Sequence, residues 1–154
     1  MEIVRAKGAL ARAQAEWIVG IEPWKGLGYA VGPLGNYLGR MAREREVWLA
    51  RQENKAGRRG SPLGLVVVQD GFLLGGFVSL LAVRPEAAGH GVGRALMDHV
   101  AAMVFRERSW LFVSCDSANP GALAFYKKLG FARVGRLPDL IKPGRVEVLL
   151  RKGR

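Results

Sequence analysis

The sequence has little of what typifies secreted or membrane-spanning proteins. It contains a single cysteine, Cys115, so no disulfide can form within the chain. Its longest apolar stretch, residues 63–83, is interrupted by polar residues and glycines, which excludes one membrane-spanning helix there. The first twenty residues include Glu2 and Glu16 and lack the uninterrupted apolar core of a secretory signal. We therefore expect a cytoplasmic protein.

Acidic residues are also few. The chain has 13 aspartates and glutamates against 24 lysines and arginines, a formal net charge of +11. Such a charge suits an anionic partner such as nucleic acid, a membrane surface or a polyphosphate ligand. The basic residues are nevertheless scattered, and no helix carries a basic stripe interleaved with aromatics. A solvated basic surface is the simpler explanation, and we expect neither nucleic acid nor a membrane as the partner.

The length and the hydrophobic periodicity predict one domain over residues 1–154, because 154 residues that are 49% hydrophobic can enclose one core. The pattern predicts an α/β (α+β) fold with a mixed, largely antiparallel sheet of six or seven strands and helices on both faces. Asp70 and Gly71 are expected to form a hairpin turn. The expected strands are 2–5, 47–52, 63–69, 77–83, 110–114, 131–136 and 146–150; the helices are 10–19, 37–45, 92–105 and 119–129; and loops cover 21–35 and 54–62.

Three closely spaced glycines stand between an expected strand and an expected helix. They are Gly89, Gly91 and Gly93 in the segment AVRPEAAGHGVGRAL, and Arg94 follows them. Amides at a helix start lie at the positive end of the helix dipole and bind anions, and glycines let a phosphate approach closely. Neither a Rossmann fingerprint nor a Walker phosphate loop fits the spacing. The segment is therefore either a pyrophosphate cradle or a flexible turn that caps the helix.

A second signature lies in the segment NPGALAFYKKLGF. Asn119 and Tyr126 are seven residues apart, about two helical turns, so they share one helix face. The chain here has a strand, a glycine-rich turn, a helix, a second strand, an Asn-led helix with a tyrosine, and a Gly-Phe pair. In this order of elements it resembles the GCN5-related N-acetyltransferase (GNAT) family. The resemblance covers roughly residues 77–136. One position departs from the family pattern, since Ala88 stands where Gln or Arg is usual.

The resemblance implies a GNAT-like fold and an N-acetyltransferase. It would move an acetyl group from acetyl-coenzyme A to a primary amine by direct transfer in a ternary complex, without a metal. Pantetheine would lie beside the strand 77–83 like an added strand, and a main-chain N–H near Leu81 or Ala82 would face the developing oxyanion. By the same resemblance, the cofactor-binding residues would be Leu81, Ala82, Val83, Gly89, His90, Gly91, Val92, Gly93, Arg94, Asn119 and Tyr126.

The resemblance also suggests which residues do the chemistry. Tyr126, with an ordinary pKa of about 10, would stay protonated and donate to the departing thiolate; packing alone is the alternative. Asn119 would cap its helix whether or not it also binds pantetheine. For the base, we name Glu22 in the loop IEPWKGLGY, with Asp116 and His90 as alternatives. Each of these three also has a purely structural interpretation.

Three classes of function stay open at this point. An acetyltransferase with an unidentified amine acceptor is the leading hypothesis. The second is a catalytically silent acyl-coenzyme A-binding or regulatory module on the same fold, and the third is a basic nucleic-acid-binding protein, for which charge is the sole argument. Cys115 is expected to be a buried strand thiol and not an acetyl carrier. A homodimer is an expectation from the family alone.

Overall fold

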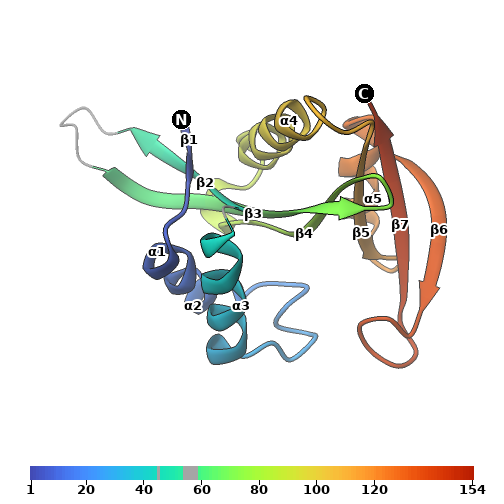
Figure 1. The fold of residues 1–154 in the computed structure, drawn as a ribbon. Coiled ribbons are helices and arrows are strands. Elements are labelled where there is room, and N and C mark those ends of the chain that lie inside the picture. Colours follow the sequence, from blue (N-terminus) through green and yellow to red (C-terminus); the bar gives the residue numbers. More distant parts are fainter. Residues whose placement is uncertain (45, 54–58) are drawn as a thin grey trace. The chain divides into compact units, whose positions relative to one another are not determined.

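The computed structural model describes residues 1–44, 46–53 and 59–154. Within these residues seven strands form one mixed sheet in the order β1-β2-β3-β4-β5-β7-β6 (Figure 1), which confirms the expected fold class. The strands are Glu2–Arg5 (β1), Val47–Glu53 (β2), Arg59–Phe72 (β3), Gly75–Val83 (β4), Trp110–Asp116 (β5), Ala132–Pro138 (β6) and Val146–Gly153 (β7). The helices are Gly8–Ala13 (α1), Ala15–Ile18 (α2), Val31–Arg43 (α3), Val92–Val104 (α4) and Pro120–Lys128 (α5), with a 3₁₀ turn at Pro85–Ala87 (η1).

The chain divides into two compact units. The first comprises residues 1–68 and 80–99, and the second comprises residues 69–79 and 100–154. No helix in the described part of the chain combines the length and the apolar character that crossing a membrane requires.

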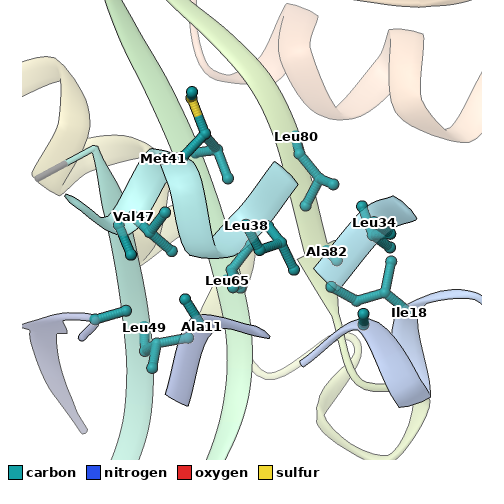
Figure 2. Packing of buried hydrophobic residues seen from close by; sticks show 14 residues of the cluster. Ala11, Ile18, Leu34, Leu38, Met41, Val47, Leu49, Leu65, Leu80 and Ala82 are labelled. Atoms are coloured by element: carbon teal, nitrogen blue, oxygen red, sulfur yellow. The ribbon is translucent and has the colours of Figure 1, made fainter. Parts of the chain in front are cut away.

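In the first unit, the helices α1, α2 and α3 cover one face of the strands. Alternate residues of β2 and β3 point toward these helices, so that Leu49 lies beside Ala11 of α1 and Leu65 beside Leu38 of α3, and all four side chains are fully buried (Figure 2). The first turns of α4 cover the opposite face. A Cβ added to Gly64 of β3 would lie 3.0 Å from Val92 Cγ1 and 3.2 Å from Leu96 Cδ1, so this glycine lets α4 approach the sheet closely. The first unit thus positions the start of α4.

In the second unit, β7 lies between β5 and β6 and runs antiparallel to both. The first residues of β4 pair in parallel with β5, from Gly75↔Trp110 to Val78↔Val113. Helix α5 begins after Asn119 and ends before Gly130, whose φ of 91° is the left-handed conformation in which helices commonly end.

Two predictions about the ends of helices are wrong. The helix expected over 10–19 begins at Gly8 and is divided at Gln14, whose buried side chain donates to the Leu10 carbonyl. The helix expected from residue 37 begins at Val31, within the predicted loop. Pro33 is compatible with this earlier start because a proline in the first turn removes an N–H that has no acceptor within the helix. Arg45, the predicted last residue, lies outside the described residues.

The predicted hairpin turn is also misplaced. The turn between β3 and β4 falls at Leu73 and Leu74, which have φ of 43° and 64°, and not at Asp70 and Gly71. Strand β3 continues to Phe72, whose ring packs 4.9 Å from that of Phe77 and 5.1 Å from that of Phe112. Aromatic packing therefore sets the length of the hairpin, although turn chemistry favours the earlier position. Of the loop expected over 54–62, residues 54–58 lie outside the described residues and 59–62 belong to β3.

Candidate functional site

The loop between β4 and α4 has the backbone conformation that a cradle requires. Gly89 and Gly91 have φ of 76° and 81°, and a Cβ added to either would have no atom within 4 Å, so both positions open to free space. The N–H of Ala95 donates to the Gly91 carbonyl at 3.0 Å, which is the first turn of α4. The amides of Val92, Gly93 and Arg94 therefore have no carbonyl in the helix to which they can donate. They are available to an anion.

Several contacts hold this loop in place. The Nδ1–H of His90 donates to the Ala88 carbonyl at 2.9 Å, so His90 braces the turn. Before the loop, the Arg84 amide donates to the Leu63 carbonyl at 2.8 Å, and its Nε donates to the Pro62 carbonyl at 2.7 Å. Val92 is buried, whereas Gly89, Gly91 and Arg94 are exposed. The loop is thus fastened to β3 and to the core while its amides stay open.

The other cofactor residues expected in the first unit lie at the end of β4. Leu81, Ala82 and Val83 follow the last residue pair of the β4–β5 ladder, Val78↔Val113. Leu81 and Val83 are partly exposed, and the Ala82 side chain is buried in the core. This alternation leaves Ala82 as the residue that anchors the strand end.

Tyr126 and Asn119 are both placed by α5, in the second unit. Tyr126 is only 7% exposed, and its ring lies 5.7 Å from that of Phe131. Burial raises the pKa of Tyr126, and the neighbouring Cys115 and Glu147 raise it further, so the hydroxyl keeps its proton at neutral pH. Asn119 Oδ1 accepts a hydrogen bond from the Ala122 amide at 3.0 Å, which confirms the helix cap.

Cys115 is a poor nucleophile in its position on β5. The residue is partly buried, and burial raises the pKa of its thiol to about 11, with the carboxylates of Glu147 and Asp116 adding to the rise and Arg133 opposing it. The thiolate is the reactive form of cysteine, so little of this residue is reactive at neutral pH.

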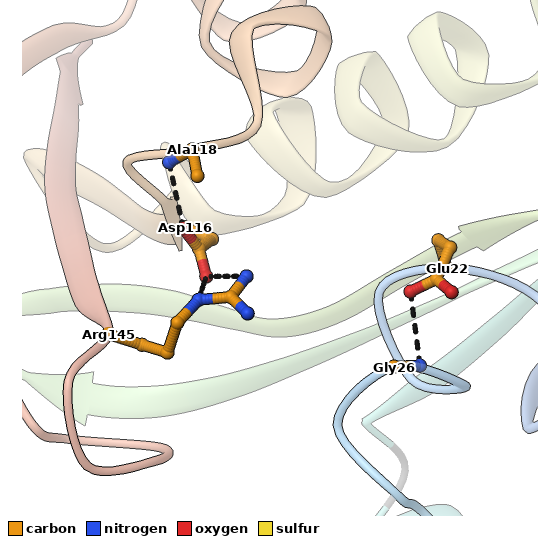
Figure 3. A network of polar contacts seen from close by, with 5 residues as sticks. All are labelled: Glu22, Gly26, Asp116, Ala118 and Arg145. Atoms are coloured by element: carbon orange, nitrogen blue, oxygen red, sulfur yellow. Dashed lines mark hydrogen bonds and ion pairs between the residues drawn. The ribbon is translucent and has the colours of Figure 1, made fainter.

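Each base named from the sequence is engaged in a structural contact, and Figure 3 shows the contacts of Glu22 and Asp116. Glu22 is exposed, and its Oε2 accepts from the Gly26 amide at 3.1 Å. Asp116 is 8% exposed; it accepts from the Ala118 amide at 2.8 Å and from Arg145 Nε at 2.7 Å. His90 is the loop brace described above. These contacts restrain all three side chains.

The structure adds one carboxylate that the sequence argument missed, Glu147 of β7. It pairs across the ladder with Asp116 and is 8% exposed. Burial raises its pKa, the side-chain hydrogen bond from Ser114 and the charge of Arg145 lower it, and Asp116 raises it. In the sequence, the one sign of Glu147 is the segment VEVLL, in which a charged residue interrupts an apolar strand. Its partner Asp116 is 31 residues earlier in the chain and becomes visible only in the folded register.

No group of three or more histidine, cysteine, aspartate or glutamate side chains suited to a metal ion occurs within residues 1–44, 46–53 and 59–154.

Comparisons with known proteins agree on one family. The sequence model of the acetyltransferase (GNAT) domain matches residues 43–133. A peptidyl-lysine N-acetyltransferase of Escherichia coli, YjaB, is 33% identical over 102 residues, which are 65% of this chain and 60% of the relative. N-alpha-acetyltransferase 30 of Saccharomyces cerevisiae is 28% identical over 90 residues, 55% of this chain and 51% of the relative. The matches thus span between half and three fifths of these relatives.

Solved structures share the whole fold. Ard1 from Thermoplasma volcanium superposes with a TM-score of 0.79 at 19% identity, over 99% of this chain and 96% of that one. A GNAT-family acetyltransferase from Bacillus cereus gives a TM-score of 0.77 at 17% identity, over 99% and 96% of the two chains. At these identities the similarity establishes the fold.

The raised pKa of Cys115 has a measurable consequence. The rate at which iodoacetamide alkylates the folded protein should rise about tenfold for each pH unit from about pH 7 to 9.5, because the thiolate fraction keeps rising below a pKa of about 11. An unstructured cysteine peptide, with a pKa of about 8.5, should level off within this range. Mass spectrometry follows both rates, and a plateau for Cys115 at the pH of the peptide's plateau would contradict the assignment.

Proposed function

Because the chain belongs to the acetyltransferase (GNAT) domain family, we propose that it transfers an acetyl group from acetyl-coenzyme A to a primary amine. Residues 1–154 would act as one domain, and the transfer would be direct, in a ternary complex. The observation that carries the proposal is the loop before α4, where Gly89 and Gly91 have positive φ and leave the amides of the first helical turn open. Such a helix start suits a diphosphate group.

The proposed cofactor position follows from this loop. The amides from Gly89 to Arg94 hold the pyrophosphate, and the exposed Arg94 adds positive charge. Pantetheine lies along Leu81 to Val83 and bonds to main-chain groups as an added strand would. The methyl group of Ala88 contributes no hydrogen bond, so this site depends on the main chain more than the usual Gln or Arg version does. Asn119 uses its Oδ1 for the cap, and its side-chain NH₂ can donate to a pantetheine carbonyl.

In the proposed reaction the amine nitrogen attacks the thioester carbonyl carbon, the C–N bond forms and the C–S bond breaks. A main-chain N–H near Leu81 or Ala82 donates to the oxyanion. Tyr126 donates to the departing sulfur, and the burial that raises its pKa keeps the hydroxyl protonated until then. The raised pKa of Cys115 supports direct transfer, because an acetyl-cysteine intermediate would need the thiolate.

Peptide or protein amines are the acceptor class that we propose. The support comes from the names of the curated relatives, one a peptidyl-lysine and one an N-alpha-acetyltransferase. Cytoplasmic location remains a prediction from the sequence, and a homodimer remains an expectation from the family alone.

The function is tested in two steps with the same protein. Calorimetry should show that acetyl-coenzyme A binds with micromolar affinity, and a panel of lysine peptides, peptides with free amino termini and small amines should give thiol release with at least one acceptor. Binding without transfer to any amine would favour a catalytically silent module. Binding of DNA or RNA with a steep salt dependence, and none of coenzyme A, would favour the nucleic-acid hypothesis.

The cradle is tested by Gly91→Val. A valine at φ of 81° would strain the loop and place a branched side chain where the diphosphate is expected, so the Kd for acetyl-coenzyme A should rise about tenfold or more. Gly28→Val is the matched control, because Gly28 has φ of 75° and open space around its Cβ but lies outside the loop. Equal Kd values for a folded Gly91→Val protein and the control would refute the cradle.

The role of Tyr126 is tested by Tyr126→Phe. Removing the hydroxyl should lower kcat by about tenfold to a hundredfold, because the thiolate then leaves without a proton donor. The Kd for acetyl-coenzyme A, measured by calorimetry, should change little. An unchanged kcat in single-turnover measurements, where chemistry limits the rate, would remove Tyr126 from this role.

A further inference from the structure

The mechanism proposed above lacks a group that takes the proton of the acceptor amine. Primary amines of lysine type are protonated at neutral pH, with a pKa of about 10.4, and must lose a proton to attack a carbonyl. A base for this step should be a carboxylate or imidazole that is held in place, partly desolvated and not already committed to a cation.

Two carboxylates face each other across β5 and β7, and their surroundings differ. Asp116 is committed, because it accepts from the Ala118 amide and from the guanidinium of Arg145. Glu147 lies directly opposite and receives a hydrogen bond from the side chain of Ser114, two residues before Asp116. Both carboxylates are 8% exposed. The two carboxylates thus have unlike surroundings, because the guanidinium of Arg145 bonds to Asp116 while a side-chain hydroxyl bonds to Glu147.

The strand register shows which side chains share a face of the sheet with Glu147. Directly paired and alternate residues share a face, so Glu147 shares one with Ser114 and Leu149. Ser114 and Leu149 are partly exposed. On the opposite face, Val113 and Leu150 are each 1% exposed. Ser114 and Leu149 therefore give a ligand partial access to the face that carries Glu147, although Phe112 and Asp116 on the same face are buried.

Resting on the acetyl transfer proposed above, we propose that Glu147 is the base that accepts the proton of the acceptor amine. The proton passes from the amine nitrogen to a carboxylate oxygen of Glu147, and the nitrogen lone pair forms the C–N bond. The electrons of the broken C–S bond leave with the sulfur, which takes the proton of Tyr126. Glu147 then returns this proton to solvent. The nitrogen carries a positive charge once the C–N bond has formed and loses its second proton to solvent, while the phenolate of Tyr126 regains a proton from solvent, so one proton is released overall.

The charged and titratable groups around Glu147 set the pH at which it works. Asp116 from β5 raises its pKa together with burial, while Arg145 from the β6–β7 loop and the hydrogen bond of Ser114 lower it. Cys115 and Tyr126 also interact electrostatically with Glu147, and both side chains are uncharged at neutral pH. The active form is the carboxylate, so activity should fall as the pH drops through the pKa of Glu147, which lies above that of an exposed glutamate, about 4.3.

Glu147→Gln tests the proposal, with thiol release measured on whichever peptide of the acceptor panel the wild type acetylates fastest. The kcat should fall about a hundredfold, the acidic limb at the pKa of Glu147 should be replaced by a rate that rises with deprotonation of the amine, and the Kd for acetyl-coenzyme A should stay within about twofold. Glu107→Gln, an exposed glutamate of the same unit, is the matched control and should keep wild-type kinetics. A Glu147→Gln protein with wild-type kcat and acidic limb would overturn the proposal, as would loss of that limb in Glu22→Gln instead.

Ser114→Ala tests the same point without removing the carboxylate. The Ser114 hydrogen bond lowers the pKa of Glu147, so its loss should move the acidic limb to higher pH while the high-pH kcat is kept. An unmoved limb in a folded variant would count against Glu147. A wild type that transfers acetyl to no amine would refute the proposed function itself, and that outcome is distinct from a failure confined to these variants.

Discussion

The left-handed backbone at Gly89 and Gly91 is the constraint on which the proposed chemistry depends. It turns the chain from β4 into α4, and no atom lies within 4 Å of the place where a Cβ at either glycine would stand. The packing of the first unit maintains this geometry, because Val92 is buried and Gly64 lets α4 lie close to β3. With Ala88 in place of a longer polar side chain, this main-chain geometry is what the loop offers to a diphosphate.

Partial burial is the common cause of the unusual acid–base properties in the second unit. Desolvation raises the pKa values of Cys115, Tyr126 and Glu147, with different chemical results. It suppresses the thiolate of Cys115, keeps the Tyr126 hydroxyl protonated and strengthens Glu147 as a base. The ion pair with Arg145 leaves Asp116 in a structural role. A neutral acid and a competent base can thus coexist at one pH.

Apart from the fold class, the features that the sequence predicted correctly are local ones. The glycine turn that leads into α4 and the Asn119 cap follow from residues close together in the chain. The missed features depend on contacts between distant residues. The hairpin turn moved to Leu73 and Leu74 because of aromatic packing around Phe72, including a ring of β5. The pairing of the Glu147 carboxylate with Asp116 likewise exists only in the folded register of β5 and β7.

A crystal structure of the protein grown with saturating coenzyme A would test the central claim most directly. The account predicts diphosphate oxygens about 2.7–3.2 Å from main-chain nitrogens between Gly89 and Arg94, with pantetheine beside Leu81 to Val83. The diphosphate would then lie beside Gly91, in the space that is free because this residue has no Cβ. Coenzyme A bound with its diphosphate on another part of the chain, and these amides still facing solvent, would contradict it.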